Sequence, residues 1–314
     1  MATRSTALPA RAARPRKSAG LWSDAFGRLR KNRLALVGLG LVTLLLFTGL
    51  FGPLLAPWSY SFQDLKSVAA GGGGPLPPLA YGHLLGTDQL GRDLFSRLLD
   101  GARISVSVAF VVQLVILTIG VPIGALAGWF GGRLDNALMR FTDIIYAFPD
   151  LLFIILLTVV FRETFFGRAM DGLLIVFVAI GLTSWVTVAR LVRGQLLALK
   201  ETEFVEAARA IGVTDRKIVT KHLLPNGIGP IIVAVTLGIP GAILAESTLA
   251  YIGIGVQPPR ASWGSLIAEG QKYVRAEPHL VLFPAIAIAV ALISFTFLGD
   301  GLRDALDPKL KGKQ

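Results

Sequence analysis

Long apolar runs constrain this chain more than any other feature. Six stretches come close to or exceed the roughly 20 residues that a helix needs to cross a hydrocarbon core of about 30 Å. They are Leu34–Leu55, Ile104–Phe130, a run ending at Phe161, Leu173–Ala189, Gly227–Val256 and Leu280–Gly299. Charged residues make up only 16% of the chain, against about a quarter in soluble domains. We therefore predict an all-α polytopic membrane protein with six transmembrane helices.

The N-terminal segment is strongly basic. Nine lysines and arginines fall within the first 33 residues, where Asp24 is the only acid. Because this arm abuts an uncharged apolar run, the positive-inside rule explains it better than nucleic-acid binding does. The run is too long for the core of a cleaved signal peptide. We expect a disordered basic tail over 1–20, and a cytoplasmic lead-in with the first span over 21–55.

The remaining charges give the topology. With six spans and an internal N-terminus, the segments placed inside carry 22 of the 31 lysines and arginines. This bias predicts that both termini are cytoplasmic, with a C-terminal tail over 300–314. The core transmembrane domain is expected over 104–299, after an outer loop over 56–103. Within that loop, leucines at a spacing of four predict an amphipathic helix over 88–100 that lies on the outer membrane face.

A polar stretch separates the fourth and fifth apolar runs. It reads EAARAIGVTDRKIVTKHLLPN over residues 206–226, and it falls on the cytoplasmic side. Thr202 can cap a first helix, and Gly212 can end it in the left-handed conformation. Thr214 can cap a second helix, which Pro225 would close. This predicts a helical hairpin over 200–226, which is either a docking element or a solvated connector between spans.

Glu206-Ala207-Ala208, Gly212 and Leu224-Pro225 together resemble the EAA loop found in the permease subunits of binding-protein-dependent ABC importers. The stretches 83–105, 255–270 and 298–309 are similar to dipeptide, oligopeptide and nickel permeases of the type with an extra N-terminal span. The likeness extends over about 20–310. His222 departs from the general loop pattern, and Arg260-Ala261 departs from the pattern before Ser-Trp-Gly.

The resemblance implies the type I ABC importer permease fold in a prokaryotic cell membrane. It assigns ATPase coupling to residues of the hairpin, namely Glu206, Ala207, Ala208, Gly212, Thr214, Leu224 and Pro225. The expected partners are a homologous second permease subunit, two ABC ATPase subunits, an extracytoplasmic solute-binding protein and membrane lipid, with no nucleic acid. Peptides are the expected cargo, and nickel or another small solute is the alternative.

The sequence lacks the residues and motifs that several kinds of catalytic and metal site require. There is no cysteine, the three histidines stand at no metal-ligand spacing, and no phosphate-binding loop motif occurs. We therefore expect no metal site, no bound cofactor and no enzymatic activity, with ATP and Mg²⁺ held by partner ATPase subunits. An ion-coupled secondary transporter and a passive channel remain as alternatives, although no internal repeat supports the former.

A few residues in or near the spans are candidates for transport. Glu246 interrupts the fifth span, where a carboxylate costs about 2.5 kcal/mol or more, so it is expected to line a translocation path or to pair with a hydroxyl such as that of Thr248. Asp150 is a weaker candidate for the same path. Gln257 and Trp263 belong to an outer loop that we place near the pore mouth, with Trp263 at the membrane interface.

Overall fold

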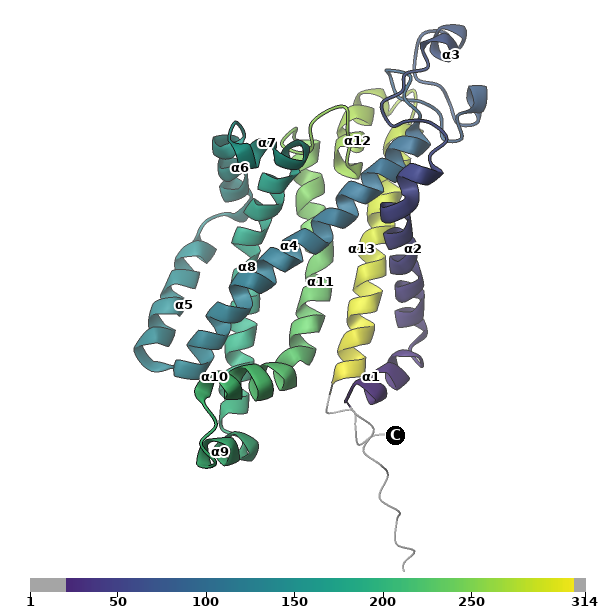
Figure 1. Ribbon diagram of the computed structural model, residues 1–314. Coiled ribbons are helices and arrows are strands. Elements are labelled where there is room, and N and C mark those ends of the chain that lie inside the picture. Colours follow the sequence, from purple (N-terminus) through teal and green to yellow (C-terminus); the bar gives the residue numbers. More distant parts are fainter. Residues whose placement is uncertain (1–20, 308–314) are drawn as a thin grey trace, which may run out of the picture.

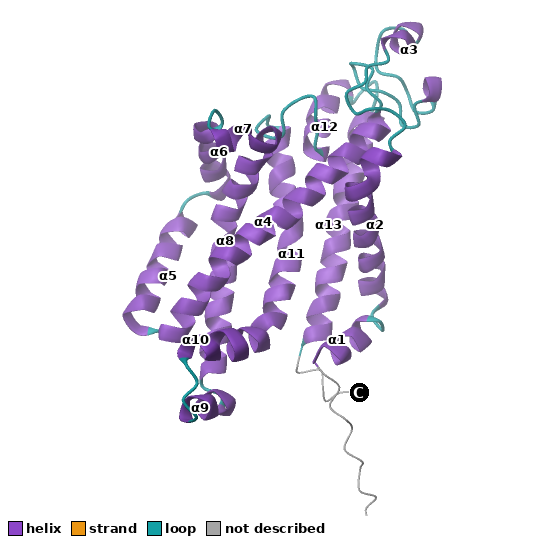
Figure 2. Ribbon diagram, viewed as in Figure 1, coloured by secondary structure: helices purple, strands orange, loops and turns teal. Residues whose placement is uncertain are grey.

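The computed structural model describes residues 21–307, and this part of the chain consists of helices and connecting loops without a β-strand (Figures 1 and 2). The predicted basic tail over 1–20 lies outside the described residues, as does 308–314. Helices are the expected solution in a bilayer because each backbone N–H and C=O must find its partner within the same segment. The all-α prediction is confirmed.

Five helices of the described chain are long and apolar enough to cross a membrane. They are α2 (Arg33–Leu55), α4 (Leu94–Phe130), α8 (Leu173–Lys200), α11 (Leu224–Tyr251) and α13 (His279–Leu306). All of them lie side by side in one bundle, which α4 crosses diagonally (Figure 1). They correspond to the first, second, fourth, fifth and sixth predicted spans.

The third predicted span is broken. It consists of α5 (Gly132–Ala147) and α6 (Asp150–Phe161), which meet at an angle of 84°. The break falls at Phe148 and Pro149, where both residues have extended backbone conformations. Proline cannot donate the helical hydrogen bond and disfavours a helical conformation in the residue before it. The pair supplies the sixth membrane crossing only if its two arms count as one span.

The prediction of a separate amphipathic helix over 88–100 is wrong. The helix begins at Leu94, where the Asp93 side chain accepts a hydrogen bond from the Ser96 amide, and it continues without a break into the second span. The charged residues within 88–100 are buried rather than facing water; Arg97, for example, has an exposed fraction of 1%. The outer loop therefore covers 56–93 and contains the short helix α3 (Leu65–Ala70).

Close contact between α4 and α8 holds the middle of the bundle together. Gly120, Gly124 and Gly128 lie on one face of α4. A Cβ at Gly120 would lie 2.8 Å from the Trp185 carbonyl oxygen, and one at Gly128 would lie 2.9 Å from that of Arg193. A Cβ at Gly124 would come closer still to the Ala189 carbonyl oxygen. These glycines therefore let two backbones touch within one chain.

The two ends of the bundle carry different elements. At one end lie α1 (Leu21–Leu29), the end of α13 and the hairpin with α9 (Glu203–Ala210) and α10 (Asp215–Lys217) (Figure 1). At the other end lie α3, α7 (Phe165–Arg168) and α12 (Trp263–Gly270). The predicted tail over 300–314 begins too early, because α13 continues to Leu306.

Replacing Gly124 with alanine tests the α4 contact. The added Cβ would overlap the backbone of α8, so we expect Gly124→Ala to lower the free energy of unfolding by about 1–3 kcal/mol. Gly40→Ala is the matched control, because a Cβ there has no atom within 4 Å. Thermal unfolding in detergent should show a lower midpoint for Gly124→Ala alone. Equal midpoints in the two variants would contradict the close contact.

Candidate functional site

The first helix of the hairpin, α9, has one buried and one exposed face. Val205 has no exposed surface and Ala208 has 7%, and both belong to the main apolar core of the chain. Glu206 and Ala207 are exposed. The EAA triplet is therefore divided, with Ala208 packed against the bundle and its two neighbours available to another molecule.

Gly212 ends α9 in the way the sequence predicts. Its φ of 80° lies in the left-handed region that a Cβ disfavours. Its amide donates to the Arg209 carbonyl at 2.9 Å, and the Val213 amide donates to the Ala208 carbonyl at 3.0 Å. These two bonds form a Schellman motif, which turns the chain sharply toward α10.

The predicted threonine caps are only partly present. Thr202 and Thr214 occupy the two N-cap positions, but neither side chain accepts a capping hydrogen bond. The Thr202 hydroxyl instead donates to the Leu199 carbonyl at 2.6 Å. The backbone carbonyl of Thr214 still accepts from the amides of Lys217 and Ile218, so the second helix starts where the sequence places it.

The sequence suggested that Pro225 closes the second helix, but the structure shows that it does not. From α10 the chain passes through a π-helical turn, Ile218–Leu223, and directly into α11. Pro225 stands in the first turn of α11, where a missing N–H costs little. Residues 215–251 thus form one continuous helical segment from the hairpin through the fifth span.

Apolar contacts fasten the hairpin to the bundle. Ile218 and Leu223 have no exposed surface and join the same core cluster as Trp129 at the end of α4. Lys200, the last residue of α8, donates from Nζ to the Trp129 carbonyl at 2.8 Å. The Arg209 guanidinium lies 4.8 Å from the centre of the Trp129 ring. Both helices of the hairpin are therefore anchored to spans of their own chain.

Glu246 is completely buried within the chain. Its carboxylate accepts a hydrogen bond of 3.5 Å from the Ser247 hydroxyl, while Thr248 donates to the Leu244 carbonyl instead. A side chain without exposed surface cannot contact a solute in this conformation. Asp150 is exposed at the first position of α6, beside the break in the third span. The structure does not bring these two predicted path residues into one site.

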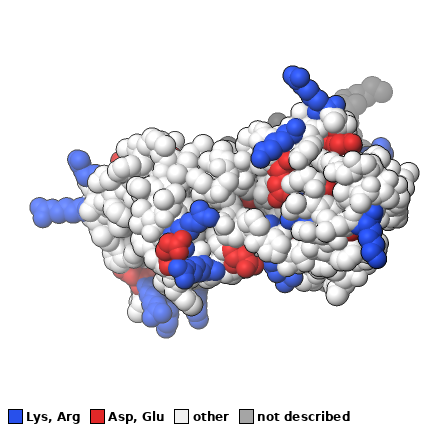
Figure 3. Space-filling model, turned by 90° about the horizontal axis from the view of Figure 1, so that it is seen from above, with Lys and Arg blue, Asp and Glu red and all other residues white. Residues whose placement is uncertain are grey.

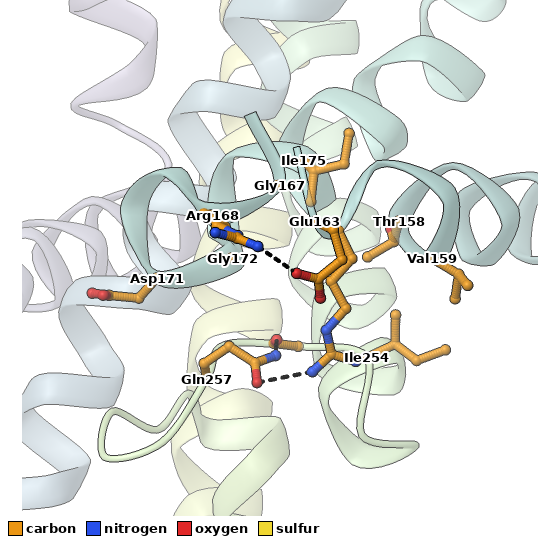
Figure 4. A pocket seen from close by; sticks show the side chains of 12 residues that line it. Thr158, Val159, Glu163, Gly167, Arg168, Asp171, Gly172, Ile175, Ile254 and Gln257 are labelled. Atoms are coloured by element: carbon orange, nitrogen blue, oxygen red, sulfur yellow. Dashed lines mark hydrogen bonds and ion pairs between the residues drawn. The ribbon is translucent and has the colours of Figure 1, made fainter. Parts of the chain in front are cut away.

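The two outer-loop candidates have different environments. Trp263 is 2% exposed and donates from its indole N–H to the Leu98 carbonyl at 3.1 Å, so it packs inside the chain, while its depth in the membrane stays a prediction. Gln257 lines a cavity of about 390 Å³ at the α12 end, and its Oε1 accepts a bond of 2.9 Å from Arg162. Glu163 and Arg168 form an ion pair in the same cavity (Figure 4).

A buried ion cluster at the α12 end was missed by sequence reasoning. Asp88 accepts from Arg92 and Arg97, each at 2.6 Å, and Glu269 of α12 accepts from both arginines at 2.9 and 2.6 Å. The cluster ties the outer loop and the start of α4 to α12. The short spacing of Asp88, Arg92 and Arg97 in the sequence could have indicated part of the cluster, but their partner Glu269 is 172 residues beyond Arg97.

Seen from above, the surface of the molecule carries scattered charges of both signs (Figure 3).

Asp64 and His83 extend the polar structure of the outer loop. His83 is fully buried, with Nδ1 2.9 Å from Asp93 and Nε2 3.6 Å from Asp64. Hydrogen bonds from the Ser67 hydroxyl and amide lower the pKa of Asp64 below its ordinary value. Within 21–307, histidines and acids form no group that could hold a metal ion.

The fold defines a polytopic helical membrane protein with a helical hairpin packed against one end of its bundle. Two family models match the chain: the binding-protein-dependent transport system inner membrane component over residues 120–312, and the N-terminal transmembrane domain of oligopeptide transport permease C over residues 20–78. The chain belongs to the family of binding-protein-dependent transport system inner membrane components, and is therefore a multi-pass inner-membrane protein.

Similar proteins cover nearly the whole chain. The oligopeptide transport system permease protein OppC of Bacillus subtilis is 40% identical over 94% of this chain and 92% of its own length. The dipeptide transport system permease protein DppC of the same organism is 42% identical over 94% and 88%. A chain of the inward-facing MetNI methionine ABC transporter shares the fold, with a TM-score of 0.54 and 22% identity over 67% of this chain and 96% of that one.

Glu269→Gln tests the ion cluster. The substitution removes a charge that holds two buried guanidinium groups, so we expect the free energy of unfolding to fall by about 2–3 kcal/mol. Glu163→Gln is the control, because its pair with Arg168 is largely exposed and should contribute less than about 1 kcal/mol. Denaturation monitored by tryptophan fluorescence should separate the two variants. If Glu163→Gln lowers the free energy of unfolding as much as Glu269→Gln does, the buried ion cluster does not stabilise the fold as we expect.

Proposed function

We propose that this chain is the permease subunit of an ATP-driven importer of di- or oligopeptides, and that it forms half of the translocation path. The observation that carries the coupling role is the hairpin, which presents Glu206 and Ala207 outward while Val205, Ile218 and Leu223 anchor it to the spans. A solvated connector would have no need for such complete apolar anchoring.

The partners follow from the division of roles within the family. Energy for uphill transport must come from another polypeptide, since the sequence carries no nucleotide-binding motif. We infer two ABC ATPase subunits, which bind ATP and Mg²⁺ and contact the hairpin from the cytoplasm. A homologous permease subunit completes the path, and an extracytoplasmic solute-binding protein delivers cargo at the α12 end. This orientation agrees with the excess of lysine and arginine at the hairpin end.

The connection between the hairpin and the spans supports a rigid-body mechanism. Closure of the ATPase pair pushes on the exposed face of α9. The push passes through Val205 to the core and through the unbroken helix of residues 215–251 to the fifth span. Spans α8 and α11 leave the two ends of the hairpin, so they tilt together and exchange the inward- and outward-facing states.

The named activities of the relatives favour peptides as cargo. The OppC and DppC proteins are described as permeases for oligopeptides and dipeptides, and each aligns with 94% of this chain. Nickel transport is the alternative within the same family, but no group of histidines and acids in the described part of the chain offers metal ligands. Initial uptake of trialanine and of a nickel complex into proteoliposomes that contain the assembled transporter separates the two.

Glu206→Lys tests the coupling role. Reversing the charge on the exposed face of α9 should lower ATP-dependent peptide uptake at least about tenfold, because like charges and lost hydrogen bonds disfavour docking. ATP hydrolysis by the partner subunits should continue without stimulation by cargo. Gly212→Val should act in the same direction, because a β-branched residue is strongly disfavoured at φ 80° and distorts the turn.

The control is Lys66→Glu, which reverses an exposed charge on α3 at the opposite end of the bundle, outside the cavity that Gln257 lines. It should leave uptake within about twofold of the unmodified chain, since substitutions at exposed surface positions usually have small effects. Membrane levels of all variants are measured by immunoblotting. Normal uptake in both hairpin variants at normal membrane levels would refute the coupling role.

A further inference from the structure

A large groove lies at the hairpin end of the bundle, lined by α8, α11 and α13. Its volume of about 750 Å³ falls in the range of about 300–1,000 Å³ that is typical of small-ligand sites. Its polar lining includes Gln195, Asn226 and Arg303, one from each helix. We propose that the groove binds the peptide before its release, with Arg303 holding the peptide carboxylate; this rests on the function proposed above.

Arg303 has the chemistry to recognise a carboxylate. It is exposed in the groove and makes no hydrogen bond or ion pair with any residue of the described chain. The nearby end of the groove is fixed, because Arg28 of α1 donates to the Asp307 carbonyl at 2.9 Å. A guanidinium group offers two parallel N–H donors that match the two oxygens of a carboxylate.

The wall formed by α11 offers acceptors for peptide N–H groups. Pro230 has no N–H, so the Asn226 carbonyl loses the donor that a helix would normally supply four residues later. The Asn226 side chain donates from Nδ2 to the His222 carbonyl at 2.6 Å, which leaves its Oδ1 as a further acceptor. Gln195 of α8 adds an amide without a partner among the described residues.

Apart from Asp307, the residue that follows α13, the remaining lining is apolar and contributes little selectivity. Leu191, Leu199, Val233 and Ala234 can contact peptide side chains of many kinds. The hydrogen-bonding groups, by contrast, match what all free peptides share, namely backbone amides and a terminal carboxylate. An anionic lipid headgroup could also pair with Arg303, but a phosphate group has no N–H donors for the carbonyl and amide oxygens of α11. The groove therefore fits a peptide better than a lipid.

The test measures peptide binding to the transporter assembled from the full-length chain and its partner subunits, without the solute-binding protein. The complex is placed in nanodiscs of neutral phosphatidylcholine, so that no anionic headgroup competes. Radiolabelled trialanine and trialanine amide serve as probes. Arg303→Gln should weaken trialanine binding about tenfold, because the charge-assisted pair is lost, and should leave binding of the amide within about twofold. Arg303→Lys should retain an intermediate affinity.

Arg133→Gln is the matched control, since Arg133 is an exposed cation of α5 outside the groove lining. It should leave both affinities unchanged. Trialanine uptake by proteoliposomes with the solute-binding protein present is measured in parallel. If the unmodified transporter imports trialanine but Arg303→Gln binds both probes as the unmodified protein does, or if no binding to the complex is detected, the groove assignment is overturned. If the unmodified transporter imports no peptide, the proposed function itself fails.

Discussion

The apolar contact between the hairpin and the bundle is the interaction on which the rest of the structure depends. Val205, Ile218 and Leu223 are completely removed from solvent and belong to one core cluster with Trp129 and Leu196. Burying an aliphatic side chain of this size contributes about 1.5–3 kcal/mol to stability, so separating the hairpin from the bundle would require several times that free energy. In the proposed mechanism, a force on its exposed face would therefore move the spans rather than bend the connection.

The opposite end of the bundle is held by charge. Asp88, Arg92, Arg97 and Glu269 connect the outer loop, α4 and α12 through hydrogen bonds that satisfy most of their polar atoms. Such a cluster depends on geometry more than an apolar contact does, because a displaced partner leaves a buried charge uncompensated. The structure thus combines a tolerant apolar attachment at the hairpin end with a geometrically demanding one at the other.

Local signals in the sequence predicted much of the fold. Apolar length located the spans, and Gly212 located the turn of the hairpin, because both depend on properties of adjacent residues. The predictions that were wrong depended on distant contacts. Leucine spacing suggested a surface helix over 88–100, but Glu269 and Asp88 draw Arg97 into the interior. The burial of Trp263 also follows from a distant contact, because the Leu98 carbonyl accepts a hydrogen bond from its indole N–H.

In the candidate site, too, local features were predicted from the sequence and features that depend on distant contacts were not. The sequence located the hairpin but not which of its residues face outward, since that follows from the packing of Ala208 against the core. Pro225 was mistaken for a helix end because a proline in the first turn of a helix looks the same in sequence as one that follows a helix. Glu246 could not be placed from sequence, since only the packed structure shows that its side chain is fully enclosed.

One measurement tests the central claim most directly. The chain contains no cysteine, so Ala207→Cys introduces a single thiol on the exposed face of α9. A short thiol crosslinker in inside-out membrane vesicles should join this position to an ATPase subunit, and ATP should change the yield. No crosslink to an ATPase, or labelling of the thiol by a membrane-impermeant reagent in intact cells, would contradict the account.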